Sequence, residues 1–320
     1  MGEVLLASIR IWARIMIPGL AWIWLMPHRP SRPLERFLHM GSMGLMIGVL
    51  HTGFVTLILG ETGLYNRQTD LLVYLATIGL GLILGWWFYG KRLLQNIRDA
   101  LPLHIMLLAG IMFILTLPHR GEWIAGGWDP GVYAGQAVAL SNSGTFYPDD
   151  SFFHELLSAE EQQLFTRTLA GRTERFPGVT VQPDKKSFTF EFFKLTPAFF
   201  GAIHRAAGMG GMLRSNTIIT LLIAPCFFVL ILHAAGLATA TFATLILATQ
   251  PILLYHTHVP LTEPLQLFLI CGLLYASILP RRLNATLLAA LFIMAAILNR
   301  FSFLPFFGIY IVCLALGEAL

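Results

Sequence analysis

The sequence predicts an all-α polytopic membrane protein with about nine membrane helices and one large external loop subdomain. Hydrophobic residues make up 56% of the chain and charged residues only 12%, roughly half the charged fraction of an average soluble domain. Apolar runs long enough to cross a bilayer recur towards both ends of the chain. These runs are continuous and do not alternate with polar residues, so the expected spans are helices.

The apolar runs divide the chain into three parts. These are N-terminal membrane helices (1–118), an external loop with interfacial helices (119–215) and C-terminal membrane helices (216–320). The nine expected spans are 5–26, 37–60, 70–90, 101–118, 216–235, 237–256, 264–280, 284–299 and 301–318. The first span carries Arg10 and Arg14 on one helix face, so the helix either turns this face into the protein or lies in the membrane interface.

Short basic loops set the expected orientation. Lys and Arg gather in residues 27–36, 91–98 and 280–282, which the positive-inside rule places in the cytoplasm. Topology therefore accounts for the net charge of +4, and we expect no nucleic-acid partner. The long polar segment then lies outside, so we expect an integral protein of the bacterial inner membrane with its site facing the periplasm.

The external segment should contain three helices and one strand. The helices are expected at 130–140, 158–170 and about 196–207, and the strand at 188–192. Ser158 and Glu161 stand in capping-box spacing at the start of the second helix. The third helix is amphipathic and should rest on the membrane surface. The strand alternates apolar and polar side chains, but the sequence identifies no partner for it.

Polar and ionisable side chains gather on the predicted external face. The candidates are Asp129, Lys194, Tyr255, His256, His258, Glu263 and Arg300. Ionisable residues next to a bilayer that face the protein interior are functional candidates by default. Their placement on one side of the membrane indicates more than each residue does alone.

Several candidates also have a purely structural interpretation. Asp129 before Pro130 suits a helix start, and Glu263 suits a helix N-terminus because of the helix dipole. Arg300 could anchor at the interface by extending its head group to water.

The aromatic and histidine candidates have structural interpretations too. His256 and His258 have the His-x-His spacing of some metal sites, and a solvated loop explains them equally well. Tyr255 and Trp128 suit an aromatic belt.

The candidate set suits one kind of chemistry. A carboxylate at the boundary between water and membrane can act as general base toward a hydroxyl group. Cations nearby can neutralise a phosphate that leaves as an anion. Together they favour transfer of a group from a lipid phosphate to an acceptor that arrives from outside.

Five segments follow the pattern of a known family. They are Gly127-Trp128-Asp129-Pro130-Gly131-Val132-Tyr133, residues 137–146, residues 194–200, Thr262-Glu263-Pro264 and Asn299-Arg300-Phe301. In these segments the chain resembles the GT-C class of integral-membrane glycosyltransferases, which use polyprenyl-phosphate-linked sugars. The protein O-mannosyltransferase and lipid A aminoarabinose transferase relatives belong to this class.

The resemblance implies that Asp129 is the catalytic base and that the reaction inverts the anomeric centre. It also implies that Glu263 acts in the same cavity and that Arg300 faces the phosphate of the donor. A divalent cation held by Glu263 and His258 is the one cofactor to consider. We expect the substrate-binding residues to be Tyr133, Lys194, Tyr255, His256, His258 and Arg300. The expected partners are a polyprenyl-phosphate sugar, an acceptor that is a lipid, glycan or protein, and membrane lipids.

Two other interpretations stay open. The same charges could form the binding site of a transporter or flippase for a lipid-linked or anionic substrate. The chain could also be a truncated, inactive member of the class, because such proteins usually place the acidic loop after the first span and are often longer.

Overall fold

The computed structural model describes residues 2–25, 30–118, 129–169, 171–176, 178–182, 186–279 and 283–319. The α-helices of these residues are α1 (Gly2–Ala21), α2 (Pro33–Glu61), α3 (Arg67–Tyr89), α4 (Lys91–Thr116), α5 (Asp129–Ser143), α6 (Ala159–Leu164), α7 (Leu195–Leu213), α8 (Ser215–Ala248), α9 (Pro251–Thr257), α10 (Glu263–Ile278), α11 (Leu283–Asn299) and α12 (Phe303–Ala319). Two short helices of other types are η1 (Ile23–Leu25) and η2 (Phe152–Leu156). The sequence motif residues 126–128 and the basic-loop residues 27–29 and 280–282 lie outside the described residues.

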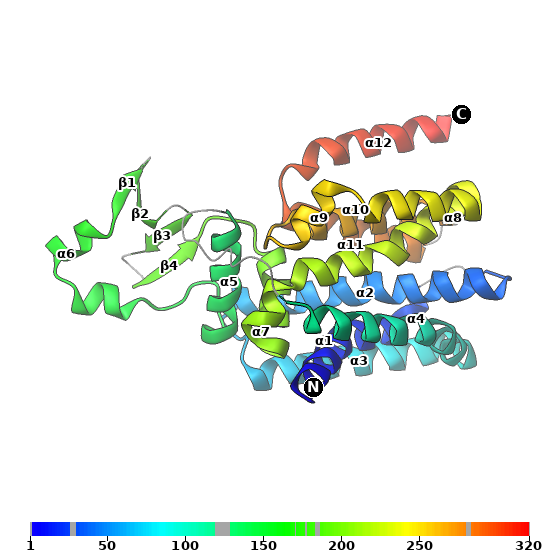
Figure 1. The fold of residues 1–320 in the computed structure, drawn as a ribbon, viewed down its shortest axis with the longest axis horizontal. Coiled ribbons are helices and arrows are strands. Elements are labelled where there is room, and N and C mark those ends of the chain that lie inside the picture. The colour runs from blue at the N-terminus through cyan, green and yellow to red at the C-terminus, as the bar shows by residue number, and fades with distance from the viewer. Residues whose placement is uncertain are drawn as a thin grey trace.

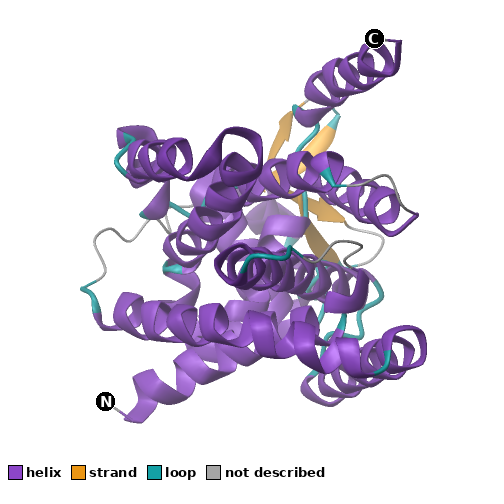
Figure 2. Ribbon diagram, turned by 90° about the vertical axis from the view of Figure 1, so that its right-hand side faces the viewer, coloured by secondary structure: helices purple, strands orange, loops and turns teal. Residues whose placement is uncertain are grey.

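The axes of most long helices are roughly aligned, and a small sheet lies at one end of the bundle (Figure 1). Among the described residues, α1, α2, α3, α4 and α8 are long and apolar enough to cross a bilayer, and α10 and α11 are shorter apolar helices. Seen along the bundle, the helices pack side by side, and the sheet lies behind them (Figure 2). α3 leaves Leu72, Ile83 and Trp87 exposed, which is the apolar surface that lipid would cover. The chain is an α-helical, membrane-embedded protein.

Gly236 divides α8 into two helical segments. Its φ of 82° lies in the left-handed region, which glycine enters without a steric cost. The chain reverses direction there, so that α9 comes back to the end of the bundle that carries the sheet (Figure 1). The boundary between the expected runs 216–235 and 237–256 therefore coincides with this turn.

Glycines let α1 and α2 approach closely. A Cβ atom at Gly48 would lie 1.8 Å from the carbonyl oxygen of Ile15, and one at Gly19 would lie 1.8 Å from that of Gly44. Small residues at such contacts are typical of helix pairs in membranes, where close backbone approach replaces the hydrophobic effect.

Arg14 decides between the two interpretations of the first span. Its guanidinium donates to both carboxylate oxygens of Asp70, at 2.6 and 3.0 Å, and to Thr56 at 3.2 Å. The Arg14 part of α1 thus turns into the protein, whereas Arg10 is exposed.

The sheet was only partly predicted. Its strands are β1 (Arg167–Leu169), β2 (Arg172–Phe176), β3 (Val179–Gln182) and β4 (Ser187–Phe190), antiparallel in the order β1-β2-β3-β4. The predicted strand at 188–192 corresponds to β4, and its missing partner is β3, with Phe190 opposite Val179 and Phe188 opposite Val181.

The helix predicted at 158–170 is shorter in the structure. Its capping box at Ser158 and Glu161 is confirmed, but α6 ends at Leu164 and the following residues form β1. The polar side chains of β1 and β2 hide the alternation typical of a strand, so periodicity favoured a longer helix.

α7 differs from the expected surface helix. The residues from Leu195 to Ile203 are all buried, and α7 packs against α2 and α5. Gly208, at φ 67°, interrupts the helix near the predicted end at about residue 207. The first half of α7 is therefore an internal wall between the bundle and the sheet region, and it positions residues of the candidate site.

Candidate functional site at the sheet end of the bundle

Glu263 and Arg300 form an ion pair although they belong to different turns. Glu263 is the first residue of α10, and Pro264 in the first turn favours the start of a helix at this point. Arg300 directly follows α11. One guanidinium nitrogen of Arg300 donates to Oε1 of Glu263. The other carboxylate oxygen of Glu263 lies 3.8 Å from Nδ1 of His256. The side chains keep 41% and 38% of their surface exposed, so solutes can reach the pair.

The Asn299 side chain connects the elements around the ion pair. Its carbonyl oxygen accepts a hydrogen bond from Thr196 at 2.5 Å, and its amide donates to Gln266 Oε1 at 2.9 Å and to the Thr262 carbonyl at 3.2 Å. Asn299 and Thr196 are completely buried. This network joins α7, α10 and α11 next to Arg300, and the roles of Thr196 and Gln266 were missed by sequence reasoning.

Tyr133 links the Asp129 end of α5 to the ion pair. It lies one helical turn after Asp129, on the same face of α5. Burial raises the pKa of Tyr133 to about 12, helped by the negative charge of Asp129 and opposed by a hydrogen bond with Thr262 and by the charge of Arg300. The phenol is therefore a neutral hydroxyl at physiological pH, within the electrostatic reach of both groups.

Asp129 itself is exposed, at the first position of α5. Its carboxylate stands in the first turn, where the helix dipole stabilises a negative charge. The interpretation as a helix start is thus confirmed, and Asp129 stays exposed in this position. The neighbouring motif residue Trp128 lies outside the described residues.

Lys194 belongs to a second, adjacent cluster. Its ammonium group lies 2.7 Å from Glu61 Oε1 and donates to the Tyr147 hydroxyl at 2.6 Å. It also sits 4.3 Å from the centre of the Tyr147 ring. Glu61 and Tyr147 lie far from Lys194 in sequence, and no local pattern indicated either of them.

A mostly apolar cavity of about 390 Å³ lies beside the Lys194 cluster, with the acids Glu61 and Glu191 in its wall. Its wall includes Leu57 of α2, Leu298 of α11, Lys194 and Phe301. The Phe301 ring packs edge-on against Phe193 at 4.5 Å between centroids. Lys194 and the residue after Arg300 thus face one cavity.

Tyr255 and His258 do not join the Glu263 corner. Tyr255 is exposed, and its ring packs against that of His256. His258 lines a separate small cavity with Arg214 and Thr257. No hydrogen bond or ion pair between described residues joins His258 to Glu263, and the described residues contain no group of three or more potential His, Cys, Asp or Glu ligands. The divalent cation stays a prediction.

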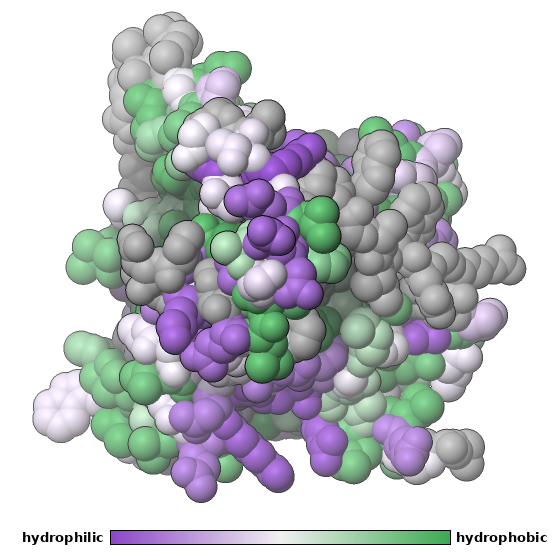
Figure 3. All heavy atoms as spheres, turned by 90° about the vertical axis from the view of Figure 1, so that its left-hand side faces the viewer, coloured by the Kyte–Doolittle hydropathy of each residue, from purple (hydrophilic) through white to green (hydrophobic). Residues whose placement is uncertain are grey.

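Hydrophilic side chains gather on this end of the molecule, above the apolar sides of the bundle (Figure 3). The end combines an exposed carboxylate, an accessible ion pair, a neutral phenol and an apolar cavity with a lysine in its wall. Such a set can bind a molecule with an anionic head and an apolar tail. Comparisons of the chain with protein-family models, with curated proteins and with solved structures found no match.

Proposed function

We propose that the protein is a membrane glycosyltransferase that moves a sugar from a polyprenyl phosphate to an acceptor on the external face, with inversion at the anomeric carbon. The proposal includes a GT-C-like architecture with about nine spans and an inner-membrane location with the site towards the periplasm. The observation that carries it is the position of Tyr133, which lies one helical turn from Asp129 and whose phenol also feels Thr262, Arg300 and Glu263.

In the proposed reaction, Asp129 accepts the proton of the acceptor hydroxyl. The hydroxyl oxygen forms a bond to the anomeric carbon while the bond from that carbon to the phosphate oxygen breaks. The bonding electrons leave with the polyprenyl phosphate, whose added charge Arg300 neutralises. A single displacement of this kind inverts the anomeric centre.

The pairing of Arg300 with Glu263 suits this role. The donor phosphate can replace the carboxylate as the partner of Arg300, because the pair is accessible and an exposed ion pair is worth only about 0–1 kcal/mol. Glu263 is then free to accept hydrogen bonds from sugar hydroxyls. Tyr133, as a neutral phenol, can donate a hydrogen bond in the same place.

The cavity beside Phe301 suits the lipid part of the donor. Leu57 and Leu298 supply apolar walls, and Lys194 places a second positive charge at the cavity. An isoprenoid chain that enters here would bring its phosphate to Lys194 in competition with Glu61, the carboxylate that pairs with this lysine, while its tail stays at the apolar bundle.

The test is consumption of radiolabelled polyprenyl-phosphate sugars by proteoliposomes that contain the full chain. We expect wild type to consume one donor, and Asp129→Asn to consume it at least about a hundredfold more slowly, as the loss of a general base requires. Asp149→Asn is the matched control, because Asp149 is an exposed aspartate of the same external region. Equal rates for wild type and Asp129→Asn would contradict the assigned base.

A second candidate function is transport of a lipid-linked or anionic substrate. It is favoured by a polar cluster inside the bundle, in which the Tyr275 hydroxyl contacts His39 and the His39 ring lies 5.7 Å from that of His233. Polar groups within a membrane bundle commonly mark substrate paths. Movement of a fluorescent polyprenyl-phosphate sugar across the vesicle membrane without loss of its sugar would favour the transporter.

A further inference from the structure

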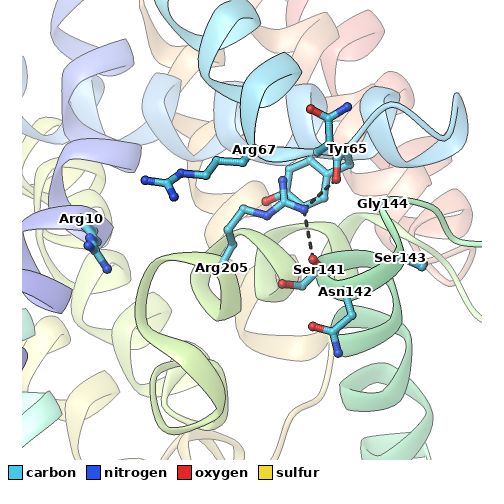
Figure 4. A pocket seen from close by; sticks show the side chains of 9 residues that line it. Arg10, Tyr65, Arg67, Ser141, Asn142, Ser143, Gly144 and Arg205 are labelled. Carbon is cyan, nitrogen blue, oxygen red and sulfur yellow. Dashed lines mark hydrogen bonds between the residues drawn. The ribbon is translucent and has the colours of Figure 1, made fainter.

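A cavity of about 570 Å³ lies at the other end of α5, where three arginines from three helices converge. Arg10 comes from α1, Arg67 from the start of α3 and Arg205 from α7, and their head groups approach the cavity from different sides (Figure 4). Ser141, Asn142 and other polar residues complete the wall, and all nine lining residues are described. The lining includes no acidic residue.

The absence of a carboxylate in this lining distinguishes the cavity from the other arginine clusters. Arg14, Arg175 and Arg300 each form an ion pair with an acid. No ion pair within the described residues involves Arg10, Arg67 or Arg205. Three like charges at one cavity repel one another, and an anion that enters the cavity would relieve this repulsion.

Arg205 is held in place before any ligand arrives. Its Nη2 donates to the carbonyl oxygens of Tyr65 at 2.7 Å and Ser141 at 3.1 Å, and its guanidinium carbon lies 3.5 Å from the centre of the Tyr65 ring (Figure 4). Its Nη1 is buried and has no hydrogen-bond partner. The fixed guanidinium contributes positive charge to the cavity wall.

The start of α3 adds to the positive potential. Asn66 caps this helix by accepting from the backbone N–H groups of Gln68 and Thr69, and Asn66 and Arg67 both line the cavity. The N-terminal end of a helix carries a partial positive charge that favours anions. The one acid of this first turn, Asp70, is already paired with Arg14.

The cavity is separate from the proposed catalytic site. Ser141 and Asp129 are twelve residues apart on α5, which places them about 18 Å apart at 1.5 Å per helical residue. The arginines also stand on the side of the bundle that we predict to be external, where the positive-inside rule disfavours them. Their presence there calls for a binding partner rather than a topological explanation.

We propose that this cavity binds the phosphate group of a phosphate-bearing ligand, either the head group of an anionic lipid or a free phosphate. Arginine forks bind phosphate oxygens in pairs, and the polar wall provided by Ser141 and Asn142 suits the remaining oxygens and their substituents. A position at the end of the helix bundle brings the head groups of surrounding lipids within reach of Arg10 and Arg67, which are exposed.

The experiment measures binding to the full chain in detergent micelles by thermophoresis. The probes are dioctanoyl phosphatidic acid, inorganic phosphate and, as the uncharged comparison, dioctanoyl glycerol. The test variant carries Arg10→Gln and Arg67→Gln, which remove exposed side chains and leave the Arg205 contacts to Tyr65 intact. The matched control carries Arg32→Gln and Arg92→Gln, two exposed arginines at the opposite end of the bundle.

We expect wild type and the control to bind phosphatidic acid at least about tenfold more tightly than the test variant does, and to bind the glycerol lipid weakly. Displacement of phosphatidic acid by inorganic phosphate would identify free phosphate as a ligand, and failure to displace it would identify the lipid head group. Equal binding by wild type and the test variant, or binding of neither phosphate probe to wild type, would overturn the proposal. Asp129→Asn should bind as wild type does, so the outcome is independent of the proposed transferase reaction.

Discussion

Two arginine–carboxylate pairs, Arg14–Asp70 and Arg300–Glu263, join segments that are distant in sequence, but their surroundings differ. The Arg14 and Asp70 side chains keep 12% and 11% of their surface exposed, whereas Arg300 and Glu263 keep 41% and 38%. The first pair is also bidentate and has Thr56 and the Tyr74 ring as further partners. The second has one direct contact and a histidine 3.8 Å away.

The difference indicates separate roles for the two pairs. A closed, bidentate pair keeps helices α1 and α3 together, and loss of one partner would leave a charge without compensation in an apolar bundle. An open pair contributes little to stability and can exchange its partner for a ligand. The Arg14–Asp70 pair therefore stabilises the fold, whereas the Arg300–Glu263 pair is available to bind a ligand.

The largest expected effect comes from the closed pair. Arg14→Gln should lower the free energy of unfolding by about 3–5 kcal/mol, because it leaves the Asp70 carboxylate buried and unpaired. Unfolding in mixed detergent micelles measures this change. Arg14→Met combined with Asp70→Leu should recover much of the loss, since no buried charge then remains. Wild-type stability of Arg14→Gln would show that the pair is not a structural one.

The helix contact beside Arg14 should show the next largest effect. Gly48→Ala would force α1 away from α2 and should cost about 1–3 kcal/mol of unfolding free energy. Gly79→Ala is the control, because a Cβ at this helical glycine of α3 meets no atom within 4 Å. The control should be neutral or up to about 1 kcal/mol more stable, since alanine favours helix more than glycine does. Similar effects of both substitutions would contradict the close contact.

A smaller change should follow at the support of the open pair. Thr196→Val removes the hydroxyl that donates to Asn299 and leaves the amide oxygen of Asn299 unsatisfied. The free energy of unfolding should fall by about 1 kcal/mol, the lower end of the cost of such a buried group. Because Asn299 precedes Arg300, we also expect weaker donor binding in the proteoliposome assay. Thr166→Val, at a half-buried threonine outside this network, should leave donor binding unchanged. Unaltered donor binding by Thr196→Val would separate the network from the site.

The smallest effect on stability is expected at the open pair itself. Arg300→Gln should change the free energy of unfolding by no more than about 1 kcal/mol, while donor consumption falls sharply. Arg32→Gln is the matched control, because it removes the arginine of another exposed pair, Arg32–Glu35, at the opposite end of the bundle. Its stability change should be similarly small, with donor consumption intact. A large stability loss in Arg300→Gln would assign this pair to the fold as well.

Local signals in the sequence predicted several elements correctly. α5 follows from Asp129-Pro130, the start of α6 from its capping box, and the turn at Gly236 from the break between two apolar runs. These features depend on residues within a few positions of one another. The strands β1 and β2 escaped prediction because their side chains are mostly polar, and pairing across the sheet, rather than local periodicity, stabilises them.

The candidate site was predicted as a set of residues but not as an arrangement. The sequence indicated Asp129, Glu263 and Arg300, but not that Glu263 and Arg300 form an ion pair. It placed Lys194 with them, whereas the structure pairs Lys194 with Glu61 and Tyr147. Ion pairs between distant segments depend on how helices pack, and a charge pattern along one helix carries no record of its partner on another.

By itself, the sequence determined the class of this protein. Continuous apolar runs require helices that satisfy their own backbone hydrogen bonds in lipid, and the scarcity of charge leaves the few ionisable residues conspicuous. Tertiary structure alone decided which of these charged side chains are buried in an ion pair and which stay exposed. Arg10, Arg14 and Arg300 look alike as arginines within or next to apolar runs. They differ because, among the described residues, Arg10 meets no acid, Arg14 meets Asp70 inside the bundle and Arg300 meets Glu263 at its surface. Burial and partner are properties of the packed helices, since both depend on groups that the chain brings together only when it folds.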